Sequence, residues 1–174
     1  ATRRAVFVTV QGWVDCRAWV DTLAAALPAG WASTVLYEGP VLSKERGSPS
    51  AANVTTELTK GAGLVVHAGH GHDNGWEGSL QTGDIVKFNN AEAPPIVLSA
   101  GCSTARFATL PPYESYVDTN GIAHKGTNHG EVFIIPPPAP ACYATGEYNK
   151  TGFGEQLLKG GRNGAAAYFG CNTG

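Results

Sequence analysis

The hydrophobic positions of this chain fall into short runs of strand length, each bounded by Gly, Pro or polar residues. Five runs stand out, at residues 5–10, 32–37, 64–68, 96–100 and 165–169. Continuous apolar runs of this length are typical of strands that are buried on both faces, as in parallel sheets. The pattern therefore predicts a mostly parallel sheet.

Segments with helical spacing separate these runs. Asp15 is a candidate cap for a helix that continues to about Leu27, and a second helical pattern covers residues 50–60 and ends before a glycine. Shorter helices are predicted at residues 82–89 and 152–159. Strands that alternate with helices are typical of an α/β fold in which helices cover both faces of the central sheet.

One segment, at about residues 107–148, does not follow this alternation. It is rich in Pro, Gly, Asn and Tyr, and its "IIPPPAPA" stretch excludes a central strand. It is also too long for an ordinary connection. We expect an irregular insertion into a single domain of residues 1–174, with no more than a short hairpin around residues 132–135.

Composition narrows the classes of protein. The chain has 174 residues, a net charge of -2 and 43% hydrophobic residues, which fits one domain with one core. It offers no basic surface for nucleic acid and no apolar run long enough to span a membrane. Methionine is absent even at position 1. We therefore expect a chain that begins after a processing cut or is a fragment of a longer product, with further segments of the same precursor as candidate partners.

Candidate chemistry lies just beyond two of the predicted strands. "LVVHAGH" (residues 64–70) and "IVLSAGC" (residues 96–102) align with a constant offset, so His70 and Cys102 follow their strands at equivalent positions. Adjacent parallel strands lie about 4.8 Å apart, and open α/β sheets bind ligands beyond the carboxyl ends of their strands. The two side chains are therefore expected to meet.

A cysteine beside a histidine is suited to acyl transfer. The imidazole generates the thiolate nucleophile and later protonates the leaving amine. The backbone amides of Gly71 and Cys102 are candidate donors to the oxyanion, because both begin loops that follow strands. Of the neighbouring histidines, His67 lies within its strand and is expected to be a buried core residue. His72 lies farther out in the loop.

Three alternatives stay open at this point. The three histidines and Cys102 could gather zinc, although His67 and His70 face opposite sides of an extended strand. Cys171 also follows a strand, so it could act as the nucleophile or pair in a disulfide. The redox states of Cys16 and Cys142 are open as well. Finally, the domain could be a non-catalytic binding module or scaffold.

Two sequence blocks carry a resemblance to a known family. "HAGHGHDNGW" and "PPIVLSAGCSTARF" resemble the gingipain family of cysteine peptidases, within the caspase-like clan. In that family a His-Gly pair after the third strand and a cysteine after the fourth form the catalytic dyad, which selects His70 and Cys102. The family's tryptophan, six positions after the histidine, matches Trp76. "GFGEQLLKGGRNGAAAYFG" is similar to the helix and strand that follow.

The resemblance implies a caspase-like three-layer sandwich and a secreted or cell-surface endopeptidase that acts on peptides or proteins. Residues beyond the fifth strand line the substrate pocket in relatives, which implies Cys171, Asn172 and Thr173 here. Trp76 is expected to pack against the active-site loop or to contact the substrate. Glu38 is a positional candidate for the carboxylate that orients the histidine. No cofactor is expected to be required; structural calcium is frequent in relatives, but this chain has no Asp-rich loop.

Overall fold

The computed structural model describes residues 2–10, 12–37, 47–146, 149, 152–159 and 163–173. The chain forms two compact units. The sheet unit comprises Ala1–Arg106 and Thr151–Gly174, and the hairpin unit comprises Phe107–Lys150. The predicted insertion thus forms a compact unit of its own. Each unit is described by itself.

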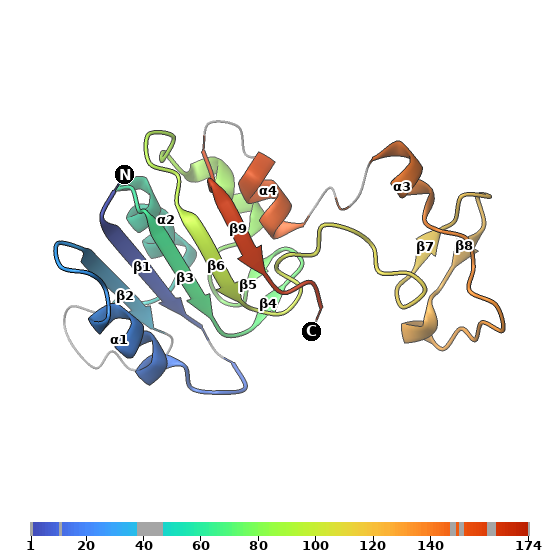
Figure 1. Ribbon diagram of the computed structural model, residues 1–174, viewed down its shortest axis with the longest axis horizontal. Coiled ribbons are helices and arrows are strands. Elements are labelled where there is room, and N and C mark those ends of the chain that lie inside the picture. Colours follow the sequence, from blue (N-terminus) through green and yellow to red (C-terminus); the bar gives the residue numbers. More distant parts are fainter. Residues whose placement is uncertain are drawn as a thin grey trace. The chain divides into compact units, whose positions relative to one another are not determined.

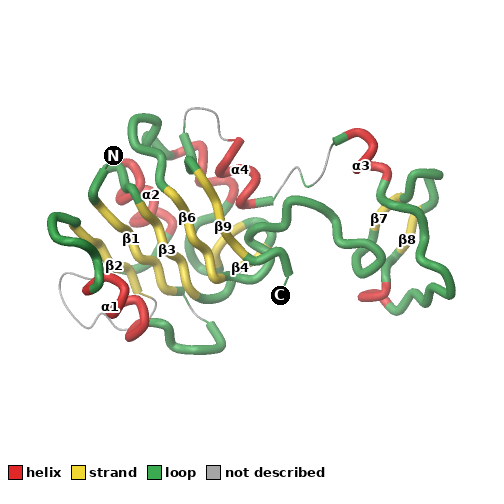
Figure 2. Tube along the Cα trace, viewed as in Figure 1, coloured by secondary structure: helices red, strands yellow, loops and turns green. Residues whose placement is uncertain are grey.

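The sheet unit is built on five parallel strands in the order β2-β1-β3-β6-β9 (Figures 1 and 2). The strands are β1 (Arg4–Thr9), β2 (Ala32–Tyr37), β3 (Leu64–Ala68), β6 (Ile96–Ala100) and β9 (Ala167–Gly170). The predicted parallel sheet is confirmed, and three of its strands have the predicted bounds. The first strand begins one residue earlier than predicted, and the last begins two residues later.

Helices cover both faces of this sheet, which confirms the predicted α/β sandwich. On one face α1 (Arg17–Ala25) buries Val20 against β1 and β3. On the other face α2 (Ala51–Thr59), the 3₁₀ helix η1 (Thr82–Lys87) and α4 (Phe153–Lys159) enclose the larger core. α1 ends two residues before Leu27. Its N-cap position is Cys16, but the predicted Asp15 supplies the capping carboxylate, which accepts the Arg17 backbone amide at 3.0 Å.

Among the described residues, α1 is the one helix on its face of the sheet, and it leaves part of that face open. Leu98 on β6 is 40% exposed and Phe169 on β9 is 60% exposed. Together with Trp19 of α1 they line an apolar groove of about 670 Å³ that extends to Ala100 and Cys171. The groove therefore reaches the carboxyl edge of β6 and β9.

The hairpin unit has little regular structure. It holds β7 (Tyr116–Val117), β8 (Ala123–His124), the 3₁₀ helix η2 (Thr127–His129) and α3 (Ala141–Thr145). The hairpin predicted around residues 132–135 was wrong, since these residues lie outside any strand. The hairpin forms earlier because the Asp118 carboxylate accepts the amides of Asn120, at 2.8 Å, and Ile122, at 3.0 Å. The sequence "DTNG" at residues 118–121 favours such a turn, whereas the purely apolar run at residues 132–135 does not.

Candidate active site

His70 and Cys102 leave neighbouring strands at the same level. β3 and β6 pair in parallel from Leu64 opposite Ile96 to Ala68 opposite Ala100, so the constant offset read from the sequence is the register of the sheet. Two residues beyond the last pair, the chain reaches His70 on one strand and Cys102 on the other. Both side chains are partly exposed.

The two turns that carry these residues touch through their backbones. A Cβ atom added to Gly71 would lie 3.0 Å from the Cα of Gly101, and one added to Gly101 would lie 3.2 Å from the Cα of Gly71. Such distances are too short for ordinary carbon contacts, so only glycine allows this approach. The segment 70–71 therefore lies directly against the segment 101–102.

The Gly71 amide is oriented by a short hairpin of β4 (Gly71–His72) and β5 (Gly75–Trp76). Gly71 lies opposite Trp76, and the amide of Glu77 donates to the His70 carbonyl at 3.1 Å. That bond makes Gly71 and Trp76 a non-hydrogen-bonded pair, in which the amides point away from the partner strand. The Gly71 N–H thus faces away from β5, as an oxyanion donor requires.

A strained turn follows Cys102. Ser103 has a φ of 57°, in the left-handed region that residues with a Cβ rarely adopt. Its amide donates to the Thr173 carbonyl at 3.2 Å, and the Ala105 amide donates to the Cys171 carbonyl at 2.8 Å. The Arg106 guanidinium also donates to the Ser103 hydroxyl at 3.0 Å. The turn after Cys102 is therefore fastened to the segment that follows β9.

This attachment brings the pocket candidates to the same edge of the sheet. Cys171, Asn172 and Thr173 are exposed and lie beside the Cys102 turn. Trp76 differs from them, because its side chain is only 1% exposed. An indole buried in this way offers no surface to a substrate. Trp76 packs behind the site, as predicted, and the alternative of direct substrate contact gains no support.

The buried side of the site consists of His67, Trp76 and Ser99. The rings of His67 and Trp76 stack at 4.4 Å, and the His67 Nδ1 atom lies 2.9 Å from the Ser99 hydroxyl. Burial lowers the pKa of His67 to about 3, so its imidazole is neutral. The predicted core histidine is confirmed. Ser99 was not among the predicted site residues, although a serine within an apolar strand, at the position equivalent to His67, was an available signal.

On the solvent side, Trp13 lies against His70. The two ring centroids are 5.7 Å apart with an interplanar angle of 77°, and Trp13 is 89% exposed. Gly12 brings the loop close, since a Cβ there would lie 3.1 Å from the Cα of Gly69. His72 is also exposed and lies 3.6 Å from a Glu77 carboxylate oxygen. An exposed aromatic ring thus borders the candidate histidine.

The remaining predictions concern Glu38, a metal site, the cysteines and membrane spans. Glu38 lies outside the described residues. Within the described part of the chain, no three His, Cys, Asp or Glu side chains gather closely enough to hold a metal ion, so the zinc alternative gains no support there. Cys16, Cys102, Cys142 and Cys171 are all free thiols. No helix among the described residues combines the length and apolar character that crossing a bilayer requires.

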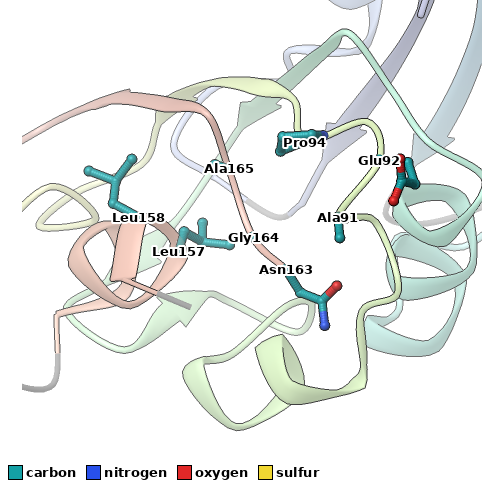
Figure 3. Close-up of a pocket in the computed structure, with 8 residues that line it drawn as sticks. All are labelled: Ala91, Glu92, Pro94, Leu157, Leu158, Asn163, Gly164 and Ala165. Carbon is teal, nitrogen blue, oxygen red and sulfur yellow. The ribbon is translucent and has the colours of Figure 1, made fainter. Parts of the chain in front are cut away.

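A second hollow, of about 320 Å³, lies at the amino ends of the strands (Figure 3). It is lined by residues that precede β6 and β9 and by the end of α4, among them Glu92, Pro94, Leu157 and Asn163. The Asn90 side chain bridges its wall, donating to the Gly164 carbonyl at 2.7 Å and accepting from the Gly164 amide at 2.9 Å. This hollow is at the amino ends of the strands and is separate from the candidate dyad.

Comparison with known proteins identifies the family. The family model of peptidase family C25 matches residues 2–174. The chain belongs to peptidase family C25. This confirms the predicted gingipain-like cysteine peptidase family. No curated protein sequence matches the chain.

Among solved structures, the chain is similar to the Arg-specific cysteine proteinase gingipain R. The TM-score is 0.58 at 15% sequence identity, over 95% of this chain and 30% of that chain. At this identity the likeness shows the fold, a caspase-like α/β sandwich, which confirms the predicted fold class. The C25 chain described here spans less than a third of the length of that relative.

Proposed function

We propose that this chain carries the catalytic centre of a cysteine endopeptidase, with Cys102 as the nucleophile and His70 as the general acid and base. The observation that supports this most directly is the register of β3 and β6, from which both residues emerge at the same level. The close approach of Gly71 and Gly101 gives further support, because it brings the two turns into contact. Membership of peptidase family C25 gives the reaction class.

In the proposed acylation step, His70 takes the proton of the Cys102 thiol, and the thiolate attacks the carbonyl carbon of the scissile bond. The amides of Gly71 and Cys102 donate to the oxyanion that forms. The C–N bond then breaks, and the His70 imidazolium gives its proton to the departing amine. The product is a thioester between the acyl part of the substrate and Cys102.

In the proposed deacylation step, His70 takes a proton from water, and the resulting hydroxide attacks the thioester carbon. The C–S bond breaks, the acid is released, and the proton returns to the Cys102 sulfur. The reaction needs no cofactor. A secreted or cell-surface location, peptide or protein substrates bound beside residues 171–173, and structural calcium belong to the same proposal, with the family resemblance as their support.

The test is covalent labelling with a peptide chloromethyl ketone. We expect the intact mass to increase by one adduct, peptide mapping to place it on Cys102, and His70→Ala to abolish it. His72→Ala is the matched control, because His72 is exposed and lies near Glu77 outside the dyad. Labelling of Cys171 in preference to Cys102, or undiminished labelling of His70→Ala, contradicts the proposal.

A further inference from the structure

A buried hydroxyl lies one level below the candidate dyad. Ser99 on β6 precedes Cys102 by the same interval at which His67 on β3 precedes His70, and the two are register partners. Ser99 is only 6% exposed, and its hydroxyl lies 2.9 Å from the Nδ1 atom of His67. The pair Ser99–His67 therefore underlies the pair Cys102–His70.

The Ser99 hydroxyl also lies within hydrogen-bond distance of Trp76 and Thr104. The indole N–H of Trp76 donates to the Ser99 oxygen at 3.1 Å, and the Thr104 hydroxyl oxygen lies 3.1 Å from it. His67 belongs to the strand that leads to His70, Trp76 to the hairpin that follows His70, and Thr104 to the turn that follows Cys102. One hydroxyl thus connects the segments on both sides of the dyad.

The hydrogen-bonding capacity of serine matches these neighbours. An indole N–H can only donate, so the Ser99 oxygen accepts it, and the Nδ1–H of a neutral imidazole donates to the same oxygen, since no partner for Nε2 is found among the described residues. The Ser99 proton is then left for the Thr104 oxygen. Thr104 adds a second link, because its hydroxyl also lies 2.9 Å from the carbonyl of Gly101, the residue before Cys102. Removal of the Ser99 hydroxyl would leave the buried groups of His67 and Trp76 without this partner.

The glycines beside the dyad rest directly on this buried cluster. A Cβ added to Gly101 would lie 2.7 Å from the Cε1 atom of His67, and one added to Gly71 would lie 2.5 Å from the Cγ2 atom of Thr104. Since interiors are close-packed and stiff, a shift of either side chain must move the glycine above it. Displacement of the cluster is therefore transmitted to the turns that carry His70 and Cys102.

We propose that Ser99 is a positioning residue for the dyad, and that its hydroxyl holds the His70 turn and the Cys102 turn in their reactive spacing. This inference rests on the proposed function. It assigns Ser99 no contact with the substrate. It predicts that loss of the hydroxyl slows the chemical step while substrate binding is unchanged.

The experiment measures labelling of Ser99→Ala by the same peptide chloromethyl ketone over a range of reagent concentrations. We expect the maximal labelling rate of Cys102 to fall at least about tenfold, with the half-saturating concentration within about twofold of wild type. Ser79→Ala is the matched control, because the Ser79 hydroxyl is equally buried and no partner for it is found among the described residues. It should label at the wild-type rate.

Thr104→Val provides a second route if Ser99→Ala does not fold. It keeps the shape of the side chain and replaces the hydroxyl by a methyl group, and it should lower the same rate. The inference is overturned, and the proposed function left standing, if a folded Ser99→Ala variant is labelled at the wild-type rate. The same holds if the half-saturating concentration changes by as large a factor as the maximal labelling rate. A wild-type protein that is not labelled at Cys102 overturns the proposed function, and the inference with it.

Discussion

Replacement of Gly71 by alanine tests the contact between the two turns of the candidate site. The added Cβ would lie 2.5 Å from the Cγ2 atom of Thr104 and 3.0 Å from the Cα and carbonyl carbon of Gly101. Non-bonded carbon atoms rest about 3.5–4.0 Å apart. The turns must therefore separate by roughly 1 Å, and two of the three close atoms belong to backbone that cannot rotate aside.

Overpacking of this kind costs about 1–3 kcal/mol of folding free energy. For a domain of this size each kcal/mol lowers the melting temperature by about 2–4 °C, so Gly71→Ala should melt about 2–12 °C below wild type. Thr104→Ser removes the Cγ2 atom and keeps the hydroxyl, so the double variant should regain part of this loss. The contacts with Gly101 prevent full recovery.

Tryptophan fluorescence is the appropriate probe, because Trp13, Trp19, Trp31 and Trp76 all belong to the sheet unit. Thermal melts of the wild type, the two single variants and the double variant form a double-mutant cycle. A Gly71→Ala variant that melts within about 1 °C of wild type would refute the close approach of the turns. Strictly additive effects of the two substitutions would place Thr104 away from Gly71.

Three further predictions concern histidines and an exposed ring. Hydrogen bonds to the carboxylates of Asp118 and Glu131 raise the pKa of His124. The hairpin unit should therefore be most stable below the ordinary histidine pKa and lose stability as the pH rises through the raised pKa. NMR of the histidine ring signals will follow this titration. Burial lowers the pKa of His67 to about 3. The sheet unit should therefore lose stability as the pH falls from about 6.5 towards that value, and tryptophan fluorescence measures this loss. A stability that does not change over this pH range would contradict the prediction. Trp13→Ala should leave the melting temperature unchanged, because the ring is 89% exposed. Since this exposed ring lies against His70, we expect it to contact a bound peptide, so the substitution should raise the half-saturating concentration of the peptide probe severalfold. Unchanged labelling would contradict that contact.

The sheet could be predicted from the sequence because its strands are apolar throughout, and burial on both faces leaves few other structures for such runs. The constant offset between residues 64–70 and 96–102 also predicted the register of β3 and β6. The hairpin of the inserted unit was misplaced because turn chemistry at Asp118 outweighed the apolar run at residues 132–135, which stays largely exposed.

The environment of individual side chains was harder to predict. Trp76 follows a Gly-rich loop, and only the fold of the short hairpin decides that its indole turns inwards to Ser99 instead of outwards to a ligand. The left-handed backbone of Ser103 likewise depends on the segment beyond β9, which is far away in sequence. Such features are set by tertiary contacts rather than by local preference.

The place at which the hairpin unit is inserted has a mechanical consequence. Residues 103–106 alone separate Cys102 from Phe107, where that unit begins, and the Gly154 amide donates to the Thr104 carbonyl at 3.1 Å where the chain returns. The stretch that leads into the insert and the helix that follows it are thus joined at the Thr104 carbonyl, two residues after Cys102. A load applied to the start of the hairpin unit would have four residues of chain to cross before it reached the candidate nucleophile.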